Sequence, residues 1–219
     1  MGRRSLAAPT RRGLIGLGAG LLSSPVFASL GLAQQKQQDG MPPGLSASRE
    51  VMAGSSLSVA VQRPPSGARI AIARPDDPDD RAILVVVLPQ ASRAVLPTPG
   101  LAGAYELRVT SDRDGKPVVH ARRPLVTTTP SATVSAPAKA IRGNSLPIRG
   151  IGPNGEQDRV VLVRKGAPAS AQTPFFYPAE NVENTLEAPD EPGEYEIRYV
   201  MNAPLAENVI LARQSVTVS

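Results

Sequence analysis

The sequence predicts an all-β protein made of two tandem antiparallel β-sandwiches. Three observations predict it: one sequence unit occurs twice, apolar and polar residues alternate along short segments, and 23 Pro and 19 Gly residues separate those segments. The alternation has the period of two that is typical of strands, and no segment has the period of an amphipathic helix. Many short strands divided by turn residues favour a sandwich over a helical or mixed fold.

The repeated unit is marked by a Gly-x-Tyr-Glu-[Leu/Ile]-Arg motif. The motif covers residues 103–108 and again 193–198, and in both copies a Leu stands nine residues before the Tyr. Other positions correspond at nearly the same spacing, such as the Gly-x-x-Leu sequences at 54–57 and 143–146. Recurrence at a domain-sized spacing indicates one structural unit used twice.

The first 33 residues have the composition of an export signal. Four arginines and no acidic residue flank the start of an apolar run over 13–22, which a Ser-Ser-Pro sequence ends. This is the order of regions in a bacterial secretory signal, and a membrane-spanning helix would need about 20 apolar residues. The segment 10–15 resembles the twin-arginine export motif, with Leu14 where Phe is usual. Cleavage after Ala28 or after Ala33 would fit; an uncleaved membrane anchor is the alternative.

Charge and cysteine content narrow the class of protein. The chain has 24 basic and 19 acidic residues, but four of the arginines lie in the signal, so the mature chain has 20 basic and 19 acidic residues. A nucleic-acid-binding protein needs a clustered basic face, for which this balance gives no support. The absence of Cys excludes disulfides, a lipoprotein anchor and Cys-ligated metals. We expect a bacterial periplasmic or secreted protein with no nucleic-acid ligand and no membrane contact after signal cleavage.

The mature chain divides into a leader and two domains. Residues 34–44 are polar, contain Gly and Pro, and are predicted to form a flexible leader. The first domain is expected over 45–128, a short linker over 129–131, and the second domain over 132–219. Each domain is large enough to fold without disulfides.

Strands are expected wherever apolar and polar residues alternate. In the first domain they cover 56–61, 69–74, 104–109 and 118–121, continuing toward 125–126. In the second domain they cover 145–148, 159–164, 175–177, 185–186, 195–200 and 209–218. The Asp-Gly sequence at 114–115 favours a hairpin turn.

The repeated motif gives two tyrosines a structural role. A glycine followed by Tyr at the start of a late strand is typical of the tyrosine corner of immunoglobulin-like and fibronectin-like sandwiches, in which the Tyr hydroxyl bonds to backbone upstream. We therefore expect Tyr105 and Tyr195 to form structural tyrosine corners with their rings in the core. Strand alternation places the Glu and Arg of each motif, Arg108 and Arg198 among them, on the opposite, outward side. A catalytic Tyr–Glu–Arg set is therefore not expected.

The second copy of the motif also carries a family resemblance. Residues 188–200 read Ala-Pro-Asp-Glu-Pro-Gly-Glu-Tyr-Glu-Ile-Arg-Tyr-Val. This run resembles the Ig-like repeats found beside von Willebrand factor A domains in proteobacterial envelope proteins. The resemblance covers the second domain well and the first more weakly, and the chain lacks the early Trp that those repeats usually carry. It implies a non-catalytic interaction or spacer module.

An acidic loop after the second predicted strand is the one candidate metal site. It carries Asp76, Asp77, Asp79 and Asp80 around a proline. Calcium binds about six to eight oxygen atoms, several of which such a loop could supply. The spacing matches no EF-hand, however, and the second domain has Lys-Gly-Ala-Pro at the matching place. A solvated loop is therefore the favoured interpretation.

No catalytic or cofactor-binding motif is present. His120 is the only histidine, and a single imidazole without Cys or another His makes a poor metal site. From the sequence, no nucleophile–base pair is expected around it. We expect no enzyme activity and no cofactor.

The candidate interaction surfaces are two strand segments in which the copies differ. In the first domain, residues 82–88 are apolar on both faces of the expected strand; at the matching place the second domain has Phe-Phe-Tyr. A strand apolar on both faces needs cover on both, so we expect a partner-binding or inter-domain surface here. Ordinary core with a few exposed hydrophobic residues is the alternative. The candidate contact residues are Val85, Val86, Val87, Phe175, Phe176 and Tyr177.

Together these features predict an exported, non-catalytic binding or spacer protein of the bacterial cell envelope, with a protein partner of unknown identity. An accessory subunit of an exported periplasmic enzyme complex is the alternative. A carbohydrate-binding module is less favoured, because sugar stacking usually uses exposed aromatic residues and the chain has no Trp.

Overall fold

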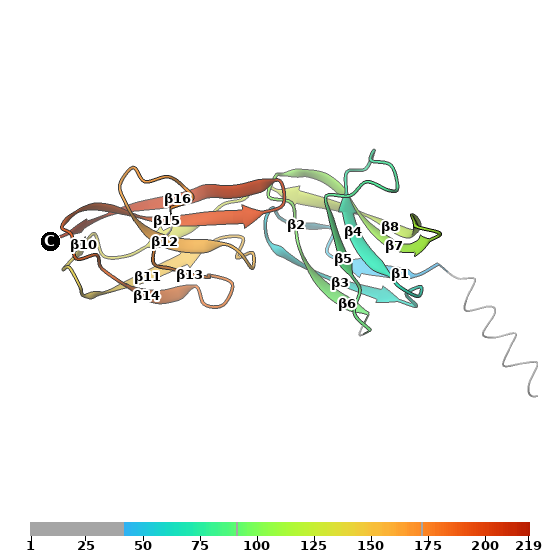
Figure 1. Cartoon of the computed structure of the whole chain (residues 1–219), viewed down its shortest axis with the longest axis horizontal. Coiled ribbons are helices and arrows are strands. Elements are labelled where there is room, and N and C mark those ends of the chain that lie inside the picture. The colour runs from blue at the N-terminus through green and yellow to red at the C-terminus, as the bar shows by residue number, and fades with distance from the viewer. Residues whose placement is uncertain (1–41, 91, 172) are drawn as a thin grey trace, which may run out of the picture. The chain divides into compact units, whose positions relative to one another are not determined.

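The computed structural model describes residues 42–90, 92–171 and 173–219, and all regular structure among them is β (Figure 1). The expected signal peptide and residues 34–41 of the expected leader lie outside these residues, and the last leader residue, Gly44, begins the first strand. Within the described part of the chain, no helix has the length and apolar character needed to cross a membrane. Residues Pro42–Ser219 form one compact unit, which contains two sandwiches in succession, called domain 1 and domain 2 below.

Domain 1 packs a three-stranded sheet on a five-stranded sheet. The three-stranded sheet has the order β1-β3-β6, with the bounds Gly44–Ala47, Ser56–Gln62 and Arg93–Pro97. The five-stranded sheet has the order β2-β8-β7-β4-β5, with the bounds Glu50–Met52, Lys116–Thr128, Gly103–Arg113, Arg69–Ala73 and Leu84–Val87.

Domain 2 repeats this arrangement strand for strand. Its three-stranded sheet has the order β14-β11-β9, with the bounds Glu183–Glu187, Ser145–Ile151 and Thr133–Ser135. Its five-stranded sheet has the order β10-β16-β15-β12-β13, with the bounds Lys139–Ala140, Ala206–Val218, Gly193–Ala203, Arg159–Arg164 and Phe175–Phe176. The duplication in the sequence is therefore a duplication of the whole fold.

The first strand of each domain is divided between the two sheets. In domain 1, β1 pairs antiparallel with β3, and β2 then pairs parallel with β8 in the other sheet. In domain 2, β9 and β10 do the same with β11 and β16. The sandwiches are therefore antiparallel except at this first strand, where the sequence analysis expected no strand and no parallel pair.

The core of each domain lies between its two sheets. In domain 1 the residues with the lowest exposure come from both sheets, among them Leu57 and Leu96 from one and Ile70, Leu107 and Leu125 from the other. Domain 2 has a matching core of its own. Alternation along each strand sends every second side chain into this space, which is why the period of two was visible in the sequence.

The motif tyrosines lie at equivalent corners of the two cores. Tyr105 and Tyr195 are each 6% exposed. The Tyr105 hydroxyl donates to the backbone oxygen of Leu101 at 3.1 Å, and the Tyr195 hydroxyl donates to that of Glu191 at 2.8 Å. Each bond ties the start of a long strand to the loop four residues before it, the geometry of a tyrosine corner.

The motif arginines are buried, and the prediction that they are exposed was wrong. Arg108 is 0% exposed and Arg198 is 2% exposed. Their side chains do lie on the face opposite the tyrosines, but in each domain a loop folds over that face. The Arg108 guanidinium donates to the backbone oxygens of Asp77 at 2.7 Å and Pro78 at 2.8 Å. Strand alternation gives the direction of a side chain, whereas only the path of the loop decides its exposure.

A carboxylate completes each arginine site. Arg108 Nε donates to Glu106 at 2.7 Å, and Arg198 Nε donates to Glu196 at 2.8 Å. In domain 2 the covering loop contributes the backbone oxygen of Ala167, 2.7 Å from Arg198 Nη1. Each guanidinium is thus paired and hydrogen-bonded within the protein, the condition under which a charge can be buried.

Replacing Arg108 with Met should destabilise domain 1 strongly. The variant fills a similar volume but leaves Glu106 and the loop oxygens without their buried donor, a loss of about 3–5 kcal/mol. Urea-induced unfolding measures it. Arg122→Met is the matched control: Arg122 also pairs with Glu106, but its side chain is 39% exposed, so the expected loss is about 0–1 kcal/mol. Equal losses for the two variants would contradict the structural role of Arg108.

Replacing Tyr105 with Phe should cost about 1 kcal/mol, because the ring stays buried and only the hydrogen bond to Leu101 is lost. Tyr177→Phe provides the control, since Tyr177 is 38% exposed and its change should stay within about 0.5 kcal/mol. The same urea titration compares the two, and an unaltered midpoint for Tyr105→Phe would show that the corner bond is dispensable.

Candidate binding surfaces

Two carboxylates of the acidic loop in domain 1 have partners within the protein. Asp79 pairs with Arg122, and Asp77 accepts a hydrogen bond from the backbone nitrogen of Arg74 at 3.0 Å. In the described residues, no group of three or more His, Cys, Asp or Glu side chains is arranged to hold a metal ion. The calcium interpretation of Asp76, Asp77, Asp79 and Asp80 therefore finds no support in the geometry. The cation that the loop encloses is the guanidinium of Arg108, bound through backbone oxygens.

His120 has a hydroxyl neighbour that the sequence analysis did not predict. Its Nε2 atom lies 2.7 Å from Ser111 Oγ, across the β7–β8 hairpin. A serine activated for catalysis also needs a third group that orients the histidine, and among the described residues no side chain bonds to the other ring nitrogen. The pair therefore has the form of a cross-strand hydrogen bond.

The apolar segment of domain 1 forms the edge strand β5. Val85 is 52% exposed and Val87 is 68% exposed, while Leu84 and Val86 pack against the core. Among the described strands β5 pairs with β4 alone. In an antiparallel edge strand, every second residue directs its N–H and C=O groups away from the sheet. This strand therefore presents both unpaired backbone groups and exposed apolar side chains.

The aromatic segment of domain 2 occupies the equivalent edge position in β13. Phe176 is buried at 6% exposure, whereas Phe175 and Tyr177 are 37% and 38% exposed. The two exposed rings meet edge to face with centroids 5.1 Å apart, and the Arg159 guanidinium lies 5.7 Å from the Phe175 centroid. These contacts hold the exposed rings in place. They border a polar hollow of ≈ 710 Å³ lined by Glu156, Gln157, Arg159, Phe175, Tyr177, Glu180 and Asn202.

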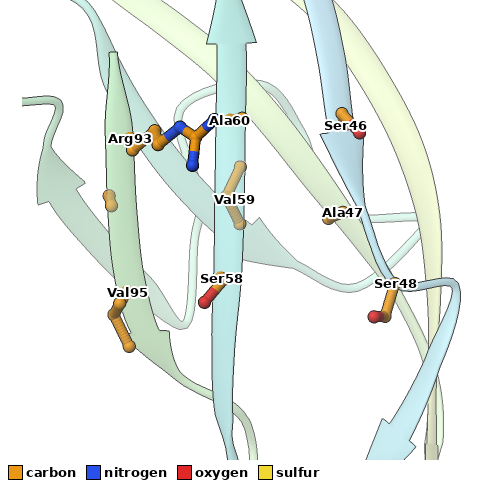
Figure 2. A pocket seen from close by; sticks show the side chains of 9 residues that line it. Ser46, Ala47, Ser48, Ser58, Val59, Ala60, Arg93 and Val95 are labelled. Carbon is orange, nitrogen blue, oxygen red and sulfur yellow. The ribbon is translucent and has the colours of Figure 1, made fainter. Parts of the chain in front are cut away.

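A groove lies on the three-stranded sheet of domain 1, where the first strand leaves that sheet. Figure 2 shows it between β1, β3 and β6, with the Arg93 side chain reaching from β6 toward Ala60 at one end. The groove measures ≈ 500 Å³ and is lined mainly by small residues; Val95, 64% exposed, lies on its β6 side. Domain 2 has a groove of ≈ 520 Å³ at the equivalent place, with Arg149 and Glu183 in its lining. Neither groove was predicted, because the sheet change that forms them leaves no sequence pattern.

A buried acid that the sequence analysis also missed shapes one loop of domain 2. Asp158 is 0% exposed and accepts hydrogen bonds from the Tyr199 hydroxyl at 2.7 Å, from Gly155 N at 2.9 Å and from Asn202 N at 2.9 Å. Burial raises the pKa of Asp158 and also that of Tyr199, which lies beside the acid. All three donors fix backbone or ring positions, so this network is structural.

Comparison with known proteins finds only distant structural likenesses. No family model and no curated protein matches the chain. Solved structures that match the chain include a segment of two fibronectin type III domains from chicken tenascin (13% identity, TM-score 0.33, covering 80% of this chain and 98% of that one). Another is the human OSCAR ligand-binding domain, with 22% identity and a TM-score of 0.31, covering 80% of this chain and 97% of that one. A third is the adhesin InvE of Yersinia pseudotuberculosis, with 18% identity and a TM-score of 0.28, covering 81% of this chain and 58% of that one. The strand order described above makes this chain an all-β protein of two tandem immunoglobulin- and fibronectin-like sandwiches.

Proposed function

We propose that this chain is an exported, non-catalytic protein of the bacterial cell envelope that binds a protein partner through domain 1. The supporting observation is the unprotected edge strand β5. Its four residues, Leu84–Val87, are all apolar, and two of them are largely exposed. The resemblance to Ig-like repeats beside von Willebrand factor A domains supports an envelope location, as does the export signal in the sequence.

The edge strands of a soluble protein usually carry features that prevent association, such as charges, prolines or short length. Three other edge strands have such protective features: β6 contains the charged Arg93 and Pro97, β14 contains the charged Glu183 and Glu187, and β13 is only two residues long. By contrast, β5 contains neither charge nor proline. Its form suits an extended partner segment that pairs with the free backbone groups and covers the exposed valines.

A simple spacer and an accessory subunit of an exported enzyme complex are the competing functions. The twin-arginine-like sequence at 10–15 favours the accessory subunit, because that route can export a protein already folded with its partner. A spacer needs no partner at β5. A crosslinking experiment at that strand therefore separates the spacer from the two binding functions, and identification of the captured protein separates those two from each other.

A photo-crosslinking residue at position 87, placed in the full-length chain in the bacterium that makes it, should capture one protein partner. Adding Val85→Lys to the same chain should abolish capture, because a charge on the exposed face opposes docking. The crosslinker at position 141 is the control: Ile141 is 61% exposed, against 68% for Val87, but lies in domain 2, outside the surfaces described above. No capture at either position would favour the spacer, and equal capture at both would contradict a specific role for β5.

Replacing both Arg11 and Arg12 with Lys should retain the protein in the cytoplasm if it uses the twin-arginine route. The conservative change keeps the positive charge of the signal but removes the arginine pair. Fractionation of cells that produce the tagged chain measures the periplasmic share. A periplasmic share equal to that of the unaltered chain would indicate the general secretory route instead.

A further inference from the structure

The end of the β15–β16 hairpin in domain 2 is apolar and buried, although it lies outside the core between the sheets. Met201, Ala203 and Ala206 are 0%, 5% and 6% exposed and form a separate cluster. An isolated sandwich has no second layer beyond a hairpin end, so something else in the unit Pro42–Ser219 must cover these residues.

The backbone of domain 1 covers Met201, Ala203 and Ala206. A β-carbon placed on Gly54 would lie 2.5 Å from Met201 Sδ, and one placed on Gly100 would lie 2.5 Å from Ala206 Cβ. The backbone nitrogen of Gly100 donates to the oxygen of Pro204, in the hairpin turn, at 2.8 Å. The two domains therefore meet in side-chain contact and in a direct hydrogen bond between their backbones.

A second segment of domain 2 reaches the same place. A β-carbon on Gly155 would lie 2.6 Å from the backbone oxygen of Gly54. Gly155 belongs to the loop that Asp158 and Tyr199 fix through hydrogen bonds. At the positions of that acid and tyrosine, domain 1 has Ala68 and Val109. The network thus exists only in the copy whose loop touches the other domain.

The two copies also differ at the hairpin end itself. The closing pair is Ala203–Ala206 in β15–β16 and Arg113–Lys116 in β7–β8, and Ser111 stands where domain 2 has Met201. Arg113 and Lys116 are exposed. In domain 1 this hairpin is exposed at its end and carries charged residues there. In domain 2 the equivalent hairpin end lies against domain 1 and carries apolar residues.

From these contacts we infer that the hairpin end of domain 2 forms an interdomain interface, called the joint below, that holds the two sandwiches together as one rigid body. The joint comprises Gly54 and Gly100 of domain 1 with Met201, Ala203, Pro204 and Ala206 of domain 2. It holds β5 of domain 1 and the Phe175–Tyr177 surface of domain 2 in a fixed mutual arrangement, whether the protein binds a partner or acts as a spacer.

Substituting Ala203→Arg and Ala206→Lys together should open the joint without unfolding domain 2. These are the residues that close the equivalent hairpin in domain 1, so the fold accepts them, but the long charged side chains cannot fit against Gly100. Backbone ¹⁵N relaxation should show one rotational correlation time for both domains in the unaltered protein. In the variant, each domain should tumble faster and separately, while amide shifts far from the joint stay unchanged. Arg113→Ala with Lys116→Ala, in the exposed hairpin, should leave the common correlation time as it is.

A pair of glycine variants tests the joint independently of the charged substitutions. Gly54 and Gly143 occupy equivalent positions, and both have left-handed backbone, with φ of 82° and 69°. Alanine therefore causes similar backbone strain at both sites, but only Gly54→Ala also meets Met201. Gly54→Ala should separate the two correlation times and Gly143→Ala should not. Separate tumbling of the domains in the unaltered protein, or a common correlation time in both joint variants, would overturn the inference.

Discussion

A buried guanidinium on the outer face of each five-stranded sheet is the interaction on which the rest of each domain depends. Arg108 and Arg198 each extend from a central strand, pair with a carboxylate two residues earlier and bind backbone oxygens of the loop above. That loop leads directly into the edge strand, β5 in domain 1 and β13 in domain 2. A charge buried in this way is tolerable only if it is fully bonded, so the loop has to follow one path, and that path sets where the edge strand begins.

The repeated motif therefore fixes both faces of the five-stranded sheet with residues only three positions apart. Tyr105 ties the inner side to the preceding loop, and Arg108 ties the outer side to the loop after β4. Tyr195 and Arg198 do the same in domain 2. The chain has no disulfide to hold its sandwiches together, and these directional bonds add to the hydrophobic cores in specifying one arrangement of the loops.

We expect function to depend on residues that differ between the two domains, because the residues that they share stabilise the fold. Three differences lie at surfaces: the valine edge of β5, the exposed aromatic pair at β13, and the apolar hairpin end that faces domain 1. The first two offer contact surfaces to a partner. The third contacts domain 1 and joins the two domains into one rigid unit, so that a partner would meet both surfaces in a fixed arrangement.

The sequence by itself determined the fold class, the duplication and the inward direction of the motif tyrosines, because strand alternation and a repeated motif are local patterns. It also located the differing strands at 82–88 and 175–177. Only the tertiary structure decided that Arg108 is buried, that Ser111 meets His120, that Asp158 organises a loop, and that Met201 belongs to a joint. Each of these depends on which distant segment covers a side chain, and such packing between loops, sheets and domains leaves no periodic signal along the chain.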